Sequence, residues 1–136
     1  MKYAKQRVIA GQSIEVHQAV QVLISDMIVT TEAANALLMS CADKTDASPD
    51  SAGINGLKAK LFASKTAVDV TNKAIQVLGG HGYCHNYTVE RLFLDTRGLT
   101  IHFKTSEWLR QDIAEAELGL CSWMRDGGHS LEEEDD

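Results

Sequence analysis

Apolar residues recur along the chain in two long runs, with the steps of three and four that an α-helix produces. The first run begins after Ser13, a candidate N-cap, and Glu15 suits the positive end of a helix dipole. The run continues to about Cys41 or Ala42. Its seam positions are Val16, Val20, Leu23, Met27, Thr30, Ala34, Leu37 and Cys41. This spacing predicts a long helix that packs one face against other helices.

The second run predicts a helix from about Leu57 to Leu78, where Gly79-Gly80 supplies a stop. Its seam positions are Leu57, Leu61, Ser64, Val68, Thr71, Ile75 and Leu78. The hydroxyls of Ser64 and Thr71 fit either a close polar helix contact or the edge of the apolar face, and the edge is the simpler interpretation. Residues 43–56, rich in Asp, Ser, Pro and Gly, predict a solvent loop between the two helices.

Shorter elements follow the second long helix. Residues 81–87 predict a loop, and Thr88 caps a short helix that carries Val89, Leu92 and Phe93. Thr105 or Ser106 caps a last helix that ends at Gly127-Gly128. Its apolar face consists of Leu109, Ile113, Ala116, Leu120 and Met124. The pattern predicts an all-α domain over residues 1–128, followed by an acidic disordered tail, residues 129–136.

The composition is that of one globular domain. The chain has 136 residues, 44% of them apolar and 24% charged, and its net charge of -6 argues against nucleic-acid binding. No segment approaches the apolar length needed to span a bilayer, so we expect no membrane partner. Three scattered cysteines suit a reducing compartment, and we expect a cytoplasmic protein.

One loop gathers metal-ligating residue types, namely His81, Cys84 and His85. Zinc needs four ligands and the paired Cys-x-x-Cys spacing is absent, so we expect no metal site. A catalytic Cys–His pair lacks an orienting third group. The glycine-rich residues 79–82 follow a helix and not a strand, so they do not fit a phosphate-binding fingerprint. A helix stop is the simpler interpretation, and close approach of a ligand to bare backbone is the alternative.

Three stretches taken together resemble the C-terminal helical domain of the acyl-CoA dehydrogenase family, whose members are FAD flavoproteins. The first is residues 3–11, followed by Gln18. The second is residues 74–83, which include Gly-Gly-His-Gly-Tyr and form the most specific part. The third is residues 89–95 with residues 105–110. The resemblance runs almost continuously from Tyr3 to about Ala116.

This resemblance implies an all-α, up-and-down helical bundle that forms oligomers and lends residues to an FAD held mainly by a neighbouring subunit. By position, Arg7 would face the FAD pyrophosphate. Gln18 and Gln76 would hydrogen-bond the cofactor, and the backbone of Gly80 would approach it. Thr105 would lie near the cofactor at the start of the last helix. Taken singly, Arg7 also fits a solvated charge, and the glutamines fit ordinary surface residues.

The departures from the family pattern bear on catalysis. Phe103-Lys104 stands before Thr105, where the family has its catalytic glutamate and a glycine. Phenylalanine accepts no proton, so we expect no catalytic residue at this position. Leu94 and Ala10 replace a usual arginine and phenylalanine. The N-terminal helical domain, the middle β-domain and most of the first helix of the C-terminal domain are not encoded.

We therefore expect an oligomerising subunit or assembly module that completes an FAD site, either as a homo-oligomer or with a larger acyl-CoA dehydrogenase-type chain. Because a partner helix is missing, an uncovered apolar face is expected. Two alternatives stay open: one chain of a split FAD-dependent oxidoreductase, of acyl-CoA dehydrogenase or flavin monooxygenase type, and a flavin-free helical interaction protein. A truncated gene product is a further alternative.

Overall fold

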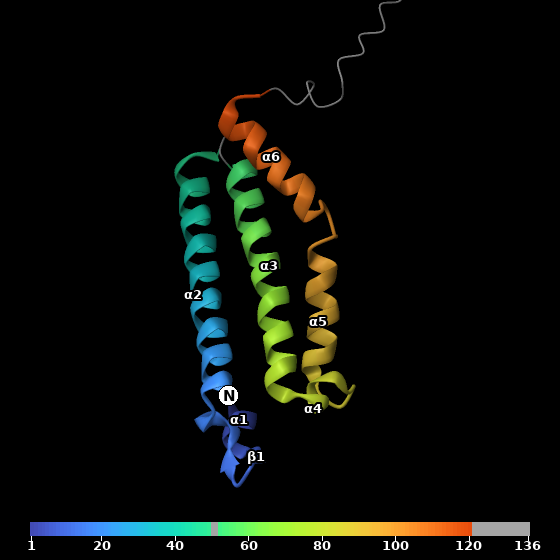
Figure 1. The fold of residues 1–136 in the computed structure, drawn as a ribbon. Helices are drawn as coiled ribbons and strands as arrows, with labels where there is room; N and C mark the ends of the chain where they lie inside the picture. The colour runs from blue at the N-terminus through green and yellow to red at the C-terminus, as the bar shows by residue number, and fades with distance from the viewer. Residues whose placement is uncertain (50–51, 121–136) are drawn as a thin grey trace, which may run out of the picture.

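The computed structural model describes residues 1–49 and 52–120, and it confirms the all-α prediction. Figure 1 shows α3 between α2 on one side and α5 and α6 on the other. The helices are α1 (Lys2–Gln6), α2 (Gln18–Ala47), α3 (Ala52–Leu78), α4 (Gly80–Tyr83), α5 (Thr88–Leu99) and α6 (Ser106–Leu118). The strands β1 (Val8–Ile9) and β2 (Gln12–Ser13) and a 3-10 turn (Ile14–Val16) lie between α1 and α2.

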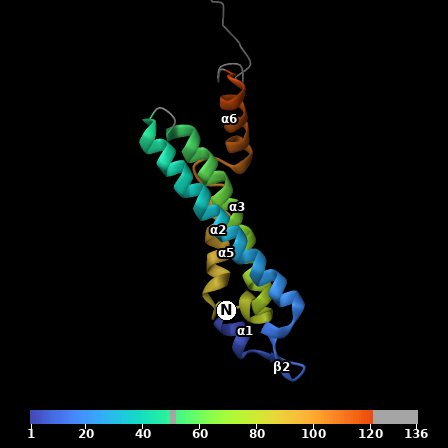
Figure 2. The same cartoon turned by 90° about the vertical axis from the view of Figure 1, so that its left-hand side faces the viewer.

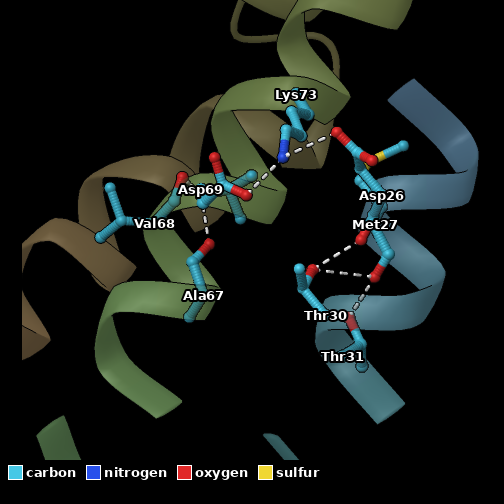
Figure 3. A network of polar contacts seen from close by, with 9 residues as sticks. Asp26, Met27, Thr30, Thr31, Ala67, Val68, Asp69 and Lys73 are labelled. Carbon is cyan, nitrogen blue, oxygen red and sulfur yellow. Dashed lines mark hydrogen bonds and ion pairs between the residues drawn. The ribbon is translucent and has the colours of Figure 1, made fainter. Parts of the chain in front are cut away.

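The seam predicted for the first long helix is confirmed within α2. Val16 falls in the 3-10 turn and is half exposed. The other seam positions are all buried or half-buried, and they are Val20, Leu23, Met27, Thr30, Ala34, Leu37 and Cys41. Thr30 fits this row because its hydroxyl donates to the carbonyl of Asp26 at 2.7 Å (Figure 3). The polar group is thereby satisfied within its own helix.

An ion-pair network links α2 to α3. Figure 3 shows Nζ of Lys73 between the carboxylates of Asp26 in α2 and Asp69 in α3, at 3.3 and 2.7 Å. The two helices run antiparallel (Figure 1), so the start of α2 lies beside the end of α3. This alignment decides which residues meet at each end of the bundle.

The edge interpretation of the two α3 hydroxyls is wrong. Ser64 is only 4% exposed, and the Thr71 hydroxyl lies 3.0 Å from the hydroxyl of Thr96 in α5. α3 is covered on both sides, so a position at the edge of one helix contact lies within the next. The close polar contact is therefore the correct alternative for Thr71.

The predicted boundaries of the long helices need correction. α2 begins at Gln18, because Ser13 ends β2 and its hydroxyl bonds Glu15 at 3.3 Å without capping a helix. α2 extends to Ala47 and α3 begins at Ala52, so most of the predicted loop is helical. Three buried residues near these ends explain the extension: Cys41, Asn55 and Ala59. Packing between the helix ends outweighs the local preference of Asp, Ser and Gly for turns.

Two shorter structures also differ from the prediction. β1 and β2 form an antiparallel hairpin that the sequence analysis did not anticipate, and its turn places Ala10 and Gly11 at φ 52° and 80°. Residues 80–83 form one helical turn, α4, which includes the first three residues of the predicted 81–87 loop. α5 starts at Thr88, with Tyr87 and not Thr88 as the N-cap residue.

The start of α6 agrees with the prediction and its end does not. The side chain of Thr105 accepts a hydrogen bond from the backbone N–H of Trp108, as an N-cap does. α6 stops at Leu118, because Gly119 takes a left-handed φ of 68°. Leu120 therefore lies beyond the helix. The predicted positions of Met124, Gly127-Gly128 and the acidic tail fall outside the described residues.

The bundle buries few large apolar side chains. Within residues 1–49 and 52–120, the buried apolar residues are Ala4, Ile14, Cys41, Ala59 and Leu109. Val22 and Val29 of α2 are more than half exposed, so the expected uncovered apolar face is present. By length and composition alone, α2 is apolar enough to cross a membrane, so the expectation that no segment reaches that length is wrong. The core helix of a globular protein passes the same test.

Candidate functional site

Two of the implied cofactor residues lie at the same end of the bundle, because α2 and α3 run antiparallel. Gln18 is the first residue of α2, and Gly80 follows directly after the end of α3 and its stop residue Gly79. Gln76 lies on the last turn of α3 and is exposed. These three residues therefore lie at one end of the bundle, which is the lower end in Figure 1.

Arg7 is brought to the same end by α1. The hydroxyl of Tyr3 in α1 donates to the carbonyl of Leu78 at 3.3 Å, which anchors α1 to the end of α3. Arg7 follows α1 directly, and its backbone N–H donates to the carbonyl of Tyr3 at 2.9 Å. Its guanidinium is exposed. The N-terminal label in Figures 1 and 2 lies beside this end of the bundle.

The glycine turn between α3 and α4 combines an open side and a closed side. Gly79 has φ +59°, which side-chain-bearing residues rarely adopt. A Cβ on Gly82 would lie 2.8 Å from the Leu78 Cβ and 2.9 Å from the Ile75 carbonyl, so this glycine lets α4 pack onto α3. A Cβ on Gly80 would meet nothing within 4 Å. The backbone at Gly80 is therefore open to a ligand.

These residues fit a phosphate-bearing cofactor such as FAD. In the part of the chain that the structure describes, the side chains of Arg7, Gln18 and Gln76 have no hydrogen-bond partner. A guanidinium binds phosphate oxygens, and amides bind a range of polar atoms. Residues 1–18 carry three basic side chains and one acidic one, in a chain whose net charge is -6. This end is thus locally basic, which favours an anionic group.

Thr105 is not part of this cluster. It caps α6, and the whole of α5, 12 residues, separates it along the chain from the glycine turn. A helix of that length spans about 18 Å. Its neighbour Glu107 occupies the α6 N-terminus, where a hydrogen bond from its own backbone N–H lowers the pKa of the carboxyl, with a smaller effect from the Thr105 hydroxyl. The structure therefore brings four of the five implied residues together and leaves Thr105 apart.

Phe103 lies in the loop between α5 and α6 and is 76% exposed. Its φ is +70°, and the backbone N–H of Lys104 donates to the carbonyl of His102 at 3.0 Å across it. This three-residue turn is a strained one for a residue with a Cβ. The ring carries no atom that accepts a proton.

The His and Cys side chains of residues 81–87 each contact a different partner. His81 Nδ1 lies 3.1 Å from the Tyr3 hydroxyl, the Cys84 thiol donates to the Gly80 carbonyl at 3.2 Å, and His85 pairs with Glu90. Residues 1–49 and 52–120 contain no group of three or more His, Cys, Asp or Glu side chains that could hold a metal ion.

An apolar groove of about 450 Å³ runs between α1, α2 and α3 next to the basic end. It is lined by Met1, Tyr3, Ile24, Ile28, Val70 and Leu78, among others. The hydrophobic pattern predicts an uncovered apolar face but not its position. Gly82 was also missed as a residue that shapes the turn, and the signal available was its place in a glycine-rich segment after a helix.

Comparison with known proteins identifies one recurrent family. The family model described as "Acyl-CoA dehydrogenase, C-terminal domain" matches residues 1–118. The 3-sulfinopropanoyl-CoA desulfinase of Cupriavidus necator is 38% identical over 126 residues, which cover 93% of this chain and 31% of that protein. The structure of butyryl-CoA dehydrogenase from Megasphaera elsdenii matches with a TM-score of 0.80 and 31% identity, over 86% of this chain and 30% of the other.

A flavin-bound structure is also among the similar folds. The structure described as "PigA with FAD and proline" matches with a TM-score of 0.79 and 28% identity, over 88% of this chain. The chain spans about 30% of the length of each of these proteins. Most of each relative therefore has no counterpart in this sequence.

Proposed function

Because the chain belongs to the acyl-CoA dehydrogenase family and corresponds to its C-terminal domain, we propose that it is an oligomerising subunit that completes an FAD site formed with another chain. The observation that carries the proposal is the convergence of four residues at the basic end of the bundle. When bound, FAD supplies the redox chemistry. This chain supplies part of the cofactor's binding surface.

Each residue of that surface has a defined task. Arg7 neutralises and hydrogen-bonds phosphate oxygens of the cofactor. Gln18 and Gln76 hydrogen-bond its polar atoms from the ends of α2 and α3. The open backbone at Gly80 lets the cofactor approach more closely than a side chain would allow. Thr105, the N-cap of α6, contributes a separate contact with the cofactor.

This domain exposes apolar surfaces that another chain would cover. The groove between α1, α2 and α3 and the exposed valines of α2 are apolar surfaces of the kind that partners cover. We infer that a second copy or a larger flavoprotein chain covers them, and that the assembly operates in the cytoplasm. The ion pair between Asp26 and Lys73 suits α2 as a helix of a protein interface better than one surrounded by lipid.

We further propose that this chain contributes no catalytic base. Phe103 has no proton-accepting atom at the position where the resemblance places the glutamate. Any proton abstraction in the assembly would therefore depend on a residue of the other chain.

FAD retention by the purified chain tests the proposal. The chain is mixed with FAD and passed over a sizing column, and flavin absorbance is read together with mass. We expect flavin to elute with an oligomer, or with the complex when an acyl-CoA dehydrogenase chain is present. Loss of the guanidinium in Arg7→Ala should weaken FAD binding at least tenfold, as for a charge-assisted hydrogen bond of 1.5–3 kcal/mol, roughly.

Arg97→Ala is the matched control, because Arg97 is an exposed arginine in the last turn of α5, away from the basic end. Equal affinity of both variants would contradict the assigned role of Arg7. A colourless oligomer that remains colourless with every flavoprotein chain tried would favour the flavin-free interaction protein instead.

A further inference from the structure

Three aromatic rings from separate segments meet at the basic end of the bundle. Tyr3 belongs to α1, His81 to α4, and Tyr87 precedes α5. The ring centroids of Tyr3 and His81 lie 5.9 Å apart, those of His81 and Tyr87 5.6 Å, and those of Tyr3 and Tyr87 6.2 Å. Both contacts of Tyr87 are edge-on, a geometry that aromatic pairs favour. The cluster joins the N-terminal segment to both sides of α4.

The Tyr3 hydroxyl reaches across the glycine pair. It lies 3.3 Å from the carbonyl of Leu78, just before Gly79-Gly80, and 3.1 Å from Nδ1 of His81, just after it. One hydroxyl carries one proton, so it donates to one of these acceptors at a time. With Nδ1 unprotonated, the hydroxyl can donate to it. With Nδ1 protonated, the imidazole donates to the hydroxyl oxygen, and the hydroxyl donates to Leu78. Both arrangements keep the contact.

The glycine pair needs such a contact to hold one conformation. Gly79 takes φ +59°, and a Cβ at Gly79 or Gly80 would meet nothing within 4 Å, so no side-chain packing restrains either residue. Glycine loses more conformational freedom on folding than any other residue. Three backbone bonds hold the turn from within: the N–H of Gly79 donates to the carbonyls of Ile75 and Gln76, and the N–H of Gly82 donates to the carbonyl of Gly79. The Tyr3 hydroxyl, which belongs to a segment distant in sequence, contacts residues on both sides of the turn.

We propose that Tyr3 is a positioning residue for the cofactor surface: its hydroxyl fixes the Gly79-Gly80 turn relative to α1 and thereby sets the spacing between Arg7 and the backbone of Gly80. Arg7 is attached to the same short helix, through the bond from its N–H to the Tyr3 carbonyl. Tyr3 itself need not touch the ligand. This inference rests on the proposed function, because the ligand whose spacing matters is FAD.

Tyr3→Phe removes the hydroxyl and keeps the ring. Tyr83→Phe is the matched control, since Tyr83 lies on α4 and is 82% exposed. Amide hydrogen exchange of the full chain by NMR reports the turn itself. We expect exchange at the amides of Gly79, Gly82 and Cys84 to become about fivefold faster in Tyr3→Phe, as for loss of one ordinary hydrogen bond. Exchange in the middle of α2 and α3, and throughout Tyr83→Phe, should stay unchanged.

Unchanged exchange at the turn in Tyr3→Phe would overturn the inference, and so would equal acceleration in every helix, which is plain destabilisation. His81→Phe serves as a second variant if Tyr3→Phe does not fold. It keeps a ring and removes the acceptor, so the hydroxyl retains only Leu78. A smaller acceleration confined to the same amides is expected, and none would contradict the proposal.

FAD affinity separates this inference from the proposed function. We expect Tyr3→Phe to weaken binding about fivefold and Tyr83→Phe to leave it unchanged. If Arg7→Ala weakens binding and Tyr3→Phe does not, the FAD site stands and the positioning role of Tyr3 is wrong. If no form binds flavin, alone or with a flavoprotein chain, the proposed function fails and the positioning role fails with it.

Discussion

The hydroxyl of Thr71 in α3 lies 3.0 Å from the hydroxyl of Thr96 in α5. Each hydroxyl also lies within hydrogen-bond distance of a carbonyl of its own helix, Thr71 of Ala67 at 2.7 Å and Thr96 of Phe93 at 3.0 Å. Each hydroxyl carries one proton, so one of them donates to its carbonyl while the other donates to the partner hydroxyl. The pair is therefore a polar link between the two helices, and the Lys60 ammonium of α3 makes a second one to the Leu99 carbonyl of α5. The pair fixes how α5 lies along α3, and α5 in turn leads from the basic end to the loop that holds Phe103.

The threonine pair predicts a specific pattern of stabilities. Thr71→Val and Thr96→Val each keep the shape of the side chain and leave the other hydroxyl with one partner fewer. We expect each single variant to lose about 1 kcal/mol of unfolding free energy. The double variant should lose clearly less than the sum of the two, because either single variant already removes the bond between the two hydroxyls. Thermal unfolding of the four proteins measures the coupling, and strict additivity would show that the hydroxyls do not interact.

The strained turn at Phe103 predicts a stabilising substitution. Phe103→Gly removes the Cβ at φ +70°, and little packing is lost from a side chain that is 76% exposed. Relief of strain, worth about 1–2 kcal/mol, should exceed the extra entropy that glycine loses on folding, about 0.5–1 kcal/mol. The melting temperature should rise by a few degrees. Phe103→Ala is the control, because it removes the ring and keeps the Cβ, and an equal rise there would assign the effect to the ring.

The close packing of α4 on α3 predicts a costly substitution. Gly82→Ala would place a Cβ 2.8 Å from the Leu78 Cβ and 2.9 Å from a backbone oxygen, and neither atom belongs to a flexible chain end. We expect a loss of about 1–3 kcal/mol, as for other overpacked sites. Gly80→Ala, where a Cβ meets nothing, is the control for stability. Comparable melting temperatures for the two variants would contradict the packing described for this turn.

The network around Lys73 predicts a dependence on alkaline pH. Its hydrogen bond with Asp69, and next its contact with Asp26, raise the pKa of the Lys73 ammonium above the ordinary value of 10.5 despite some loss of hydration. A raised pKa in the folded state means that the stabilisation is complete below 10.5 and is lost as pH rises through the folded-state value. Thermal unfolding between neutral pH and pH values above that of free lysine should therefore show this loss.

Lys73→Met should lack that alkaline loss. Lys65→Met provides the comparison, because Lys65 is an exposed lysine of the same helix that has no ion-pair partner among the described residues. If the native chain and Lys73→Met lose stability in parallel as pH rises, the ion pairs do not hold α2 against α3.

The helical class, the seam of α2, the stop at Gly79 and the cap at Thr105 could be predicted, because each depends on residues close in sequence. The helical structure of residues 43–47 could not, since it depends on Cys41 packing near Asn55 and Ala59 of another helix. Gln18 and Gly80 lie at the same end of the bundle because α2 and α3 pack antiparallel, and no local sequence pattern predicts how two helices pack. Contact between Tyr3 and His81 joins segments far apart in sequence, and nothing in either segment alone indicates it.

The small number of buried side chains has a consequence for how the chain responds to urea. The slope of unfolding free energy against denaturant concentration scales with the surface that unfolding exposes. A single layer of helices, with α3 alone covered on two sides, has little surface left to expose (Figures 1 and 2). The isolated chain should therefore unfold gradually over a wide range of urea, and a steeper transition at higher protein concentration would measure the area that a second chain has covered.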